Sequence, residues 1–93
     1  MQKITLDKNI LIGGVVHDAK DYQIVHMNLK AGNQTDNYSN DKTVSIFNIS
    51  GVITVTTEEK VFKLEAFEIL EIECGVEHII TCLEDAQVIV YKI

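Results

Sequence analysis

The residue best placed to do chemistry is His78, which ends a short glycine-containing stretch, residues 73–78 (Glu-Cys-Gly-Val-Glu-His). Apolar runs precede and follow this stretch, at residues 69–72 and 79–82. A glycine between two β-favouring runs marks a tight reversal, so His78 is predicted to lie just past the bend of a hairpin. An imidazole in such a place can transfer a proton or bind a metal ion.

The other histidines and the cysteines give weaker signals. His17 and His26 fall on the first expected hairpin, and His26 alternates with apolar neighbours, which predicts that it faces away from the interior. Cys74 and Cys82 are too far apart along the hairpin for a disulfide, and we interpret them as small buried thiols of a reducing compartment. A solvated acidic face, with no loop spacing suited to calcium, is the interpretation of Glu65, Glu68, Glu71, Glu73 and Glu77.

The composition limits the class of partner. A chain of 93 residues is expected to form one domain, 1–93, and its 46% hydrophobic content predicts a homodimer, because so small a body cannot easily cover that much apolar surface. The net charge of −6, without a basic cluster, opposes nucleic-acid binding. No apolar run reaches the roughly 18–20 residues of a membrane helix, and the first residues lack the apolar centre of a signal peptide. A soluble, cytoplasmic protein without a membrane partner is therefore expected.

The elements that must position His78 are predicted to be strands. No segment shows a helical period of useful length, and apolar runs recur about every ten residues between polar turns. The spacing predicts an all-β, antiparallel sandwich or barrel of roughly eight short strands. The expected strands are 11–17, 22–29, 44–50, 52–56, 61–64, 67–74, 78–83 and 86–91.

Glycine spacing adds a resemblance to a family. The chain resembles a small single-domain cupin, the RmlC-like jelly-roll family, whose first motif begins and ends with glycines that match Gly32 and Gly51. The second motif matches at Gly75 and His78, and Phe67 takes the place of its leading glycine. The resemblance covers roughly residues 22–91 and implies a cupin-like barrel.

The departures from these motifs concern the metal. The two histidine positions of the first motif hold Tyr38 and Asn40, and the glutamate position holds Val44, so only His78 remains of the family's usual ligands. A catalytic divalent ion needs about three converging protein ligands. We therefore expect no tightly bound metal and no cofactor; any metal that does bind would use His78.

The same comparison predicts a pocket. The resemblance places position 44 inside the barrel, and alternation then turns Ile46 and Asn48 inward; His78 inward likewise implies Ile80 and Cys82. Polar groups among hydrocarbon suit a small organic ligand with a few hydrogen-bonding groups. The predicted ligand-binding residues are Tyr38, Asn40, Val44, Ile46, Asn48, His78, Ile80 and Cys82.

Each polar member also has a structural interpretation. A lone histidine in a β-domain is more often structural than catalytic. Tyr38 can cap the barrel with its hydroxyl in water, and Asn40 suits a turn. Asn48 would point outward if the register slipped by one residue.

Three functions remain open at this level. The favoured one is a metal-poor cupin-like protein that binds a small organic molecule without chemistry. The second is a metal-independent enzyme resembling the family's isomerases and epimerases, with His78 as general base and Tyr38 as general acid. The third is a structural or interaction module with a filled barrel.

Overall fold

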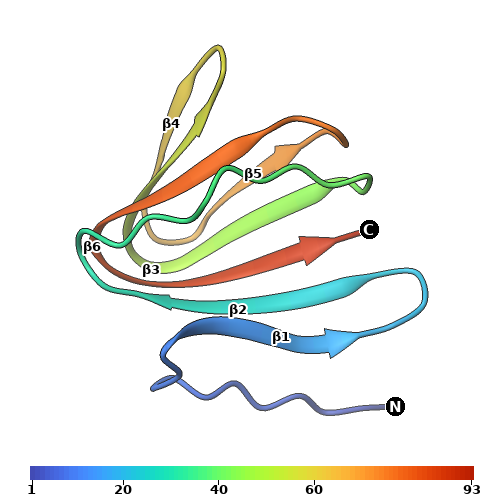
Figure 1. Ribbon diagram of the computed structural model, residues 1–93. Coiled ribbons are helices and arrows are strands. Elements are labelled where there is room, and N and C mark those ends of the chain that lie inside the picture. The colour runs from blue at the N-terminus through green and yellow to red at the C-terminus, as the bar shows by residue number, and fades with distance from the viewer.

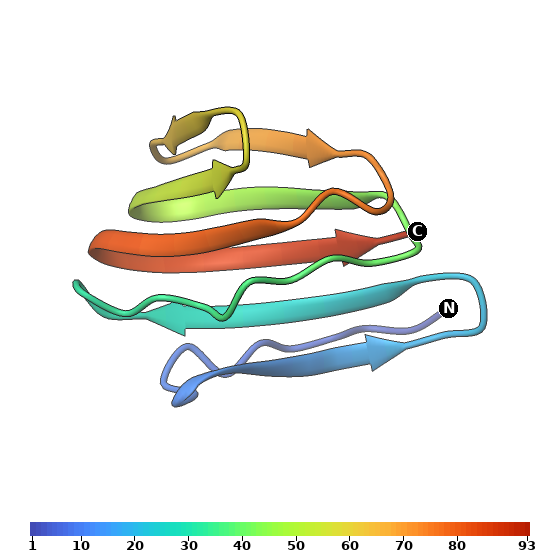
Figure 2. The ribbon, with the colours of Figure 1, turned by 45° about the horizontal axis from the view of Figure 1, so that its top comes forward.

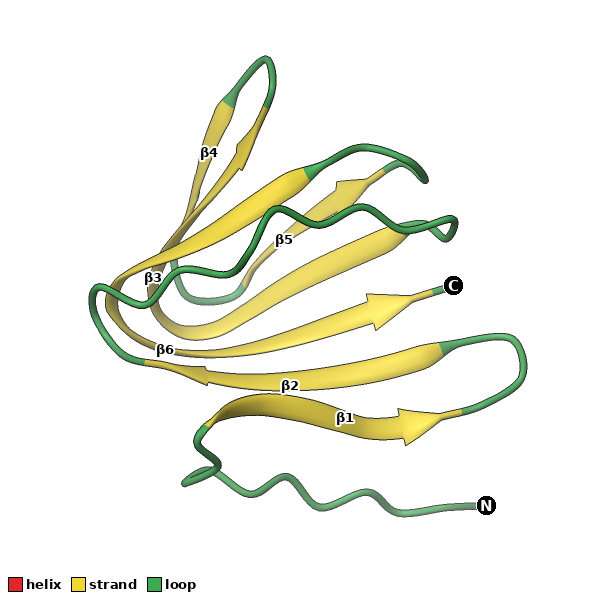
Figure 3. Cartoon of the chain, viewed as in Figure 1, coloured by secondary structure: helices red, strands yellow, loops and turns green.

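The computed structural model describes all residues, 1–93, and every regular element in it is a β-strand (Figure 3). Neighbouring strands are antiparallel throughout. The antiparallel all-β class predicted from the sequence is therefore confirmed. The strands are β1 (Ile12–Asp18), β2 (Gln23–Leu29), β3 (Val44–Thr57), β4 (Val61–Leu64), β5 (Glu68–Ile72) and β6 (His78–Lys92).

The long strands β3 and β6 pair with each other over most of their length, and both bend (Figure 1). Before its bend, β3 lies between β5 and the end of β6; after it, β3 lies between β4 and the start of β6. The bends fold one six-stranded sheet into two facing layers. Strands β1 and β2 extend the first layer beyond β6, and β4 extends the second layer (Figure 2). This is the predicted jelly-roll arrangement.

The number of strands differs from the expectation, because six strands stand where about eight were predicted. Each long strand contains two of the expected runs, joined by a bend instead of a turn. The polar pair Glu84 and Asp85 predicts a turn, yet β6 stays paired with β3 across it: Glu84 lies opposite Val52, and the register shifts on either side of that pair. The outer side of a bend is exposed, as the outer side of a turn is, so polar composition does not distinguish the two.

The hydrophobic core fills the space between the two layers. Alternation along β3 shows how it forms, since Val44, Ile46, Ile53 and Val55 are buried while their immediate neighbours are partly exposed. The start and end of β6 contribute in the same way. The cluster of buried hydrophobic residues comprises Val25, Leu29, Val44, Ile46, Ile53, Val55, Leu64, Ile72, Ile80, Cys82, Ala86, Val88 and Val90.

The outer side of the first layer is partly covered by the segment that precedes β1. The side chain of Asn28 donates from Nδ2 to the carbonyl of Ile10 at 2.9 Å. His26 lies on this outer side, as its alternation with apolar neighbours predicts, and is nevertheless buried. Its Nε2 donates to Oε1 of Gln87 at 2.6 Å. His26 therefore belongs to a structural network outside the barrel.

Candidate functional site

A pocket of about 200 Å³ lies between the layers, beside His78. Its walls come from β2, from both ends of β6 and from the segment after β2 that runs along the start of β6 (Figure 1). The lining residues are Val25, Met27, Thr35, Asp36, Asn37, Tyr38, His78, Ile80, Val90 and Lys92.

One wall of this pocket is hydrocarbon. Val25 and Met27 point inward from β2, on the opposite face from His26. Val90 joins them from the end of β6 and Ile80 from its start, so both layers contribute. An apolar wall of this kind favours the hydrocarbon part of a ligand through removal of its surface from water.

The polar wall is built by residues 35–38, part of a segment that the sequence marks as almost wholly polar. Tyr38 forms a two-way bridge with His78, whose backbone N donates to the Tyr38 carbonyl at 2.8 Å and whose carbonyl accepts from Tyr38 N at 3.0 Å. Further along, Oγ1 of Thr35 accepts from the backbone N of Ile80 at 2.9 Å. These bonds hold the segment against β6, which fixes the position of its side chains at the pocket.

His78 is the most enclosed polar group of the pocket, with only 4% of its surface exposed. Its Nδ1 lies 3.2 Å from the carbonyl of Val76. A carbonyl can only accept, so Nδ1 carries the proton and a neutral ring leaves Nε2 as an acceptor. Nε2 has no hydrogen-bond partner in the protein. It differs from His26 Nδ1 and Asn48 Oδ1, which are also unpaired but are fully enclosed. Nε2 is thus an acceptor that a molecule in the pocket can reach.

Tyr38 links His78 to the last residue of β6. The two aromatic rings meet edge to face, with centroids 5.7 Å apart at 81°. Nζ of Lys92 donates to the Tyr38 hydroxyl at 2.9 Å and lies 4.5 Å from the centre of the same ring. Nδ2 of Asn40 also donates to this hydroxyl.

These contacts change the acidity of the phenol. Burial and, to a lesser extent, the carboxylate of Asp41 raise the pKa of Tyr38, but the hydrogen bonds from Lys92 and Asn40 and the lysine's charge outweigh both and hold the pKa below its ordinary 10.0. The hydroxyl of Tyr38 is consequently a better proton donor than a free phenol.

The predicted site residues fall into two groups in the structure. Tyr38, His78 and Ile80 line the pocket. Asn40 reaches it only through the Tyr38 hydroxyl. The remaining predicted residues are buried and point inward but lie outside the pocket lining: Val44, Ile46, Asn48 and Cys82.

Asn48 and Cys82 have structural contacts of their own. Nδ2 of Asn48 donates to the carbonyls of Gly51 at 2.9 Å and Leu64 at 3.1 Å, beside the bend of β3. The thiol of Cys82 donates to the carbonyl of Glu84 at 3.0 Å. Burial, together with the carboxylate of Asp85, raises the pKa of the Cys82 thiol, which leaves it unreactive.

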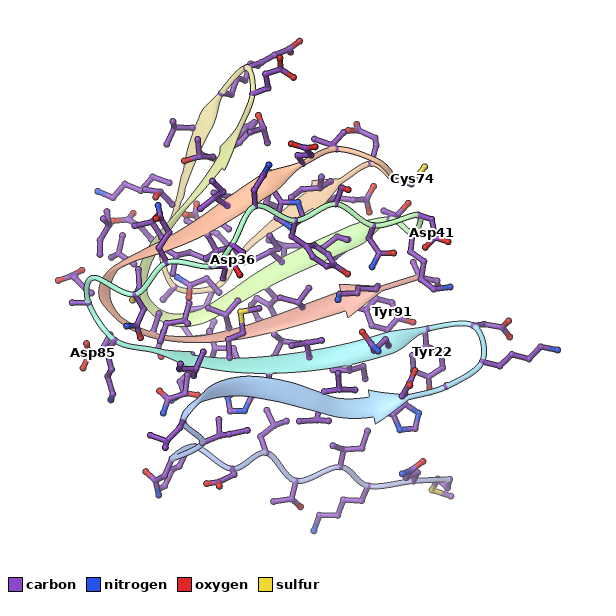
Figure 4. The ribbon with its side chains drawn as sticks, in the orientation of Figure 1. Tyr22, Asp36, Asp41, Cys74, Asp85 and Tyr91 are labelled. Atoms are coloured by element: carbon purple, nitrogen blue, oxygen red, sulfur yellow. The ribbon has the colours of Figure 1, made fainter.

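The expectation that both thiols are buried is wrong for Cys74. It is exposed, on the loop between β5 and β6, and Figure 4 shows it at the end of the molecule opposite Asp85. Cys74 points into solvent from the glycine-containing reversal that the sequence predicts, whereas Val76 of the same loop packs against the core.

Seven residues of the pocket lining were not predicted from the sequence: Val25, Met27, Thr35, Asp36, Asn37, Val90 and Lys92. The expected last strand ended at Tyr91, although the inward alternation of Val88 and Val90 continues to Lys92. Alternation places His26 on the outer face of its strand, and it therefore places the neighbouring Val25 and Met27 inside. Both signals are present in the sequence, but the pairing of β2 with β6 is not.

A metal ion does not fit the residues present. No group of three or more His, Cys, Asp or Glu side chains comes together in the structure. Of the positions at which the resemblance places ligands, Val44 has no donor atom, and the Tyr38 hydroxyl already accepts from Lys92 and Asn40. His78 alone does not make a site for a divalent ion.

A wider groove of about 660 Å³ opens between the β3–β4 hairpin, β5 and the loop before β6. Its glutamates include Glu71, Glu73 and Glu77, which are exposed, as the expected solvated face requires. Glu65 and Glu68 are exposed as well. Hydrated carboxylates of this kind give the groove no preorganised ligand group.

No protein-family model and no curated protein matches the sequence. Among solved structures, an RmlC-like cupin from Methanocaldococcus jannaschii with a double-stranded β-helix fold is similar at a TM-score of 0.86 and 18% identity, over 99% of this chain and 89% of that one. An RmlC-like cupin from Desulfovibrio desulfuricans gives 0.86 and 18%, over 99% and 95%. A conserved protein of unknown function from Streptococcus pyogenes gives 0.85 and 15%, over 100% and 95%.

These likenesses extend over nearly the whole chain. No helix in the structure has the length and apolar character needed to cross a membrane. The chain has the cupin fold, the double-stranded β-helix of the RmlC-like proteins.

Proposed function

We propose that this chain binds a small organic molecule in the pocket beside His78, without metal and without chemical change. The observation that carries the proposal is the free Nε2 of His78, an acceptor on a side chain that is only 4% exposed. Nε2 is not one of the fully enclosed unpaired atoms, so it opens to the pocket, where the protein offers it no hydrogen-bond partner. A ligand donor that reaches Nε2 would supply the missing partner.

The size of the pocket limits the ligand. Its volume of about 200 Å³ is below the roughly 300–1,000 Å³ typical of pockets for drug-sized molecules. One hydrocarbon wall and one polar wall suit an amphipathic molecule of a few carbon atoms. A pocket at this place also argues against a filled barrel, because a filled barrel leaves no space beside His78.

Binding can be tested by titrating a library of small metabolite-like compounds into the ¹⁵N- and methyl-labelled protein. Saturable shifts at Met27, Ile80 and Val90, unchanged by EDTA, are the expected result. The variant His78→Phe should lose them, whereas His17→Ala, which removes a histidine outside the pocket, should retain them. The proposal fails if no compound shifts these signals or the melting temperature.

A second candidate is a metal-independent isomerase or epimerase. The lowered pKa of Tyr38 and its ring contact with His78 favour it, because they place a proton donor next to a free imidazole acceptor. Nε2 of His78 would take a proton from a substrate carbon, and the Tyr38 hydroxyl would supply one. Exchange of C–H for C–D in keto acids and keto sugars dissolved in D₂O would reveal this activity. Exchange that persists in His78→Ala would eliminate this mechanism.

Association into a homodimer is also proposed. The outer face of the first layer supports it, since Ile69, Phe47 and Ile89 stand opposite one another on β5, β3 and β6. Ile69 is 64% exposed. A two-fold axis would bring the same row from a second copy against this one. Light scattering should show a dimer for the wild type and for Ile69→Val, and a monomer for Ile69→Lys; a monomeric wild type at micromolar concentration would contradict the proposal.

A further inference from the structure

Lys92 is the positive charge of the pocket. It is the last residue of β6 and points inward in the alternation that buries Val88 and Val90. The structure contains one ion pair, Lys30 with Asp85 at 3.7 Å, so no carboxylate of the protein neutralises Lys92. Its Nζ has one hydrogen-bond partner, the Tyr38 hydroxyl.

An ammonium has three N–H donors, and two of those on Lys92 are left without a protein acceptor. Lys92 is partly buried, but its hydrogen bond to Tyr38 is exposed, so the ammonium lies at the mouth of the pocket, where it can donate to an anion that enters. Asp36 also lines the pocket, but it is exposed, so water and salt screen its charge.

Building on the proposed function, we infer that the ligand is a small organic carboxylate that carries a hydroxyl or N–H group. The carboxylate would accept hydrogen bonds from Nζ of Lys92. The hydroxyl or N–H group would donate to Nε2 of His78. The Tyr38 ring contacts both of these side chains and so holds them at one end of the pocket. The short hydrocarbon part would lie against Val25 and Met27.

The structure favours a carboxylate over a phosphate. The sequence has no arginine, and Lys92 is the only lysine in the pocket lining. Phosphate sites normally combine several cationic or backbone N–H donors, often at a helix N-terminus, and this fold has no helix. A single ammonium matches a single negative charge.

Three matched probes separate the inference from the proposed function: 3-hydroxybutyrate, its neutral amide 3-hydroxybutyramide, and butyrate, which lacks the hydroxyl donor. Titrations followed at the methyl signals of Val25, Met27, Ile80 and Val90 measure each affinity. We expect 3-hydroxybutyrate to bind about tenfold or more tightly than the amide, because a charge-assisted hydrogen bond is lost. Butyrate should bind more weakly than 3-hydroxybutyrate, because Nε2 of His78 stays unpaired.

Two variants test the role of the lysine. Lys92→Met keeps a side chain of similar length but removes the charge, and it should abolish the preference for the acid over the amide. Lys63→Met removes an exposed lysine of β4 and should leave the preference unchanged. Lys92→Arg keeps the charge and should retain the preference for the acid. This variant also shows whether a loss in Lys92→Met reflects the missing charge or misfolding.

The outcomes are distinct. If the amide binds as tightly as the acid, or if Lys92→Met keeps the preference, the carboxylate inference is wrong while ligand binding in the pocket stands. If neither the acids nor the amide shifts the pocket methyls, and the broader library fails as well, the proposed function is wrong and this inference falls with it.

Discussion

Gly51 and Asp85 are in backbone contact at the bend that makes two layers out of one sheet. A Cβ added to Gly51 would lie 2.0 Å from the carbonyl oxygen of Asp85, and Gly51 has a φ of +78°. Both the close approach and the left-handed backbone require a residue without a side chain. The glycine at the end of the first cupin motif is therefore the point about which β3 and β6 bend together.

Replacing Gly51 by alanine should destabilise the protein by about 3 kcal/mol or more, since it combines a clash with strain in the left-handed region. Urea unfolding measures the change. Gly32→Ala is the matched control, because Gly32 has a φ of +93° but no atom within 4 Å of an added Cβ. It should cost only the strain, about 1–2 kcal/mol. Equal losses in the two variants would mean that the contact with Asp85 does not limit this position.

Phe67 occupies a glycine position of the second cupin motif, and its φ of 68° is in the left-handed region. Its ring is 79% exposed, so it gains little from packing in the monomer. Phe67→Gly should therefore raise the free energy of unfolding by about 0.5 kcal/mol, as relief of strain exceeds the added entropy of the unfolded chain. Phe67→Ala keeps the strain and should give no such gain. A loss of stability in Phe67→Gly would show that the ring makes contacts, for example with a second copy.

The glycine positions show which features of the fold can be predicted from the sequence. Gly32, Gly51 and Gly75 all have positive φ, so the motif spacing that suggested the cupin fold records real backbone requirements. The same positions carry no information about side chains that pack from other strands. His78 was therefore predicted beside the pocket, whereas Val25 and Met27 enter it only through the pairing of β2 with β6.

The inward direction of Asn48 was predicted correctly, but its surroundings were not. Alternation determines which face a residue of β3 occupies. The carbonyls that Asn48 meets are brought there by the bend at Gly51 and by the following strand. Contacts made at a bend depend on three-dimensional closure, which a periodic pattern does not contain. For that reason Asn48, which was expected to bind a ligand, instead donates hydrogen bonds to backbone carbonyls.

The ionisation of Tyr38 should depend on Lys92. Because the lysine's hydrogen bond and charge help to lower the pKa of Tyr38, Lys92→Met should raise it. Tyrosine ¹³Cζ shifts, followed against pH, measure this directly. The stability consequence has a defined sign: the ionised phenol is favoured by folding, so this contribution is present above the unfolded pKa of about 10 and is lost as pH falls through the lowered pKa. An unchanged Tyr38 titration in the variant would contradict the contact.

Asn48→Asp tests whether the amide supports the bend. The substituted carboxylate has the same shape but cannot donate, so it would face the carbonyls of Gly51 and Leu64 without a hydrogen bond. At pH 7 the loss should be about 3 kcal/mol or more, since a charge and two carbonyls are left buried without partners. Burial raises the pKa of such a carboxyl, and the protonated form regains one donor, so the loss should shrink as pH falls toward 5.

Asn33→Asp provides the comparison for that variant. Asn33 is partly exposed and only accepts with its side chain, from Lys30 N at 2.9 Å, a role that a carboxylate fulfils equally well. Unfolding of both variants at pH 7 and pH 5 separates a general effect of added charge from the specific loss at the bend. If Asn48→Asp loses no more stability than Asn33→Asp, the bend depends on Gly51 alone, and Asn48 is then available for another role.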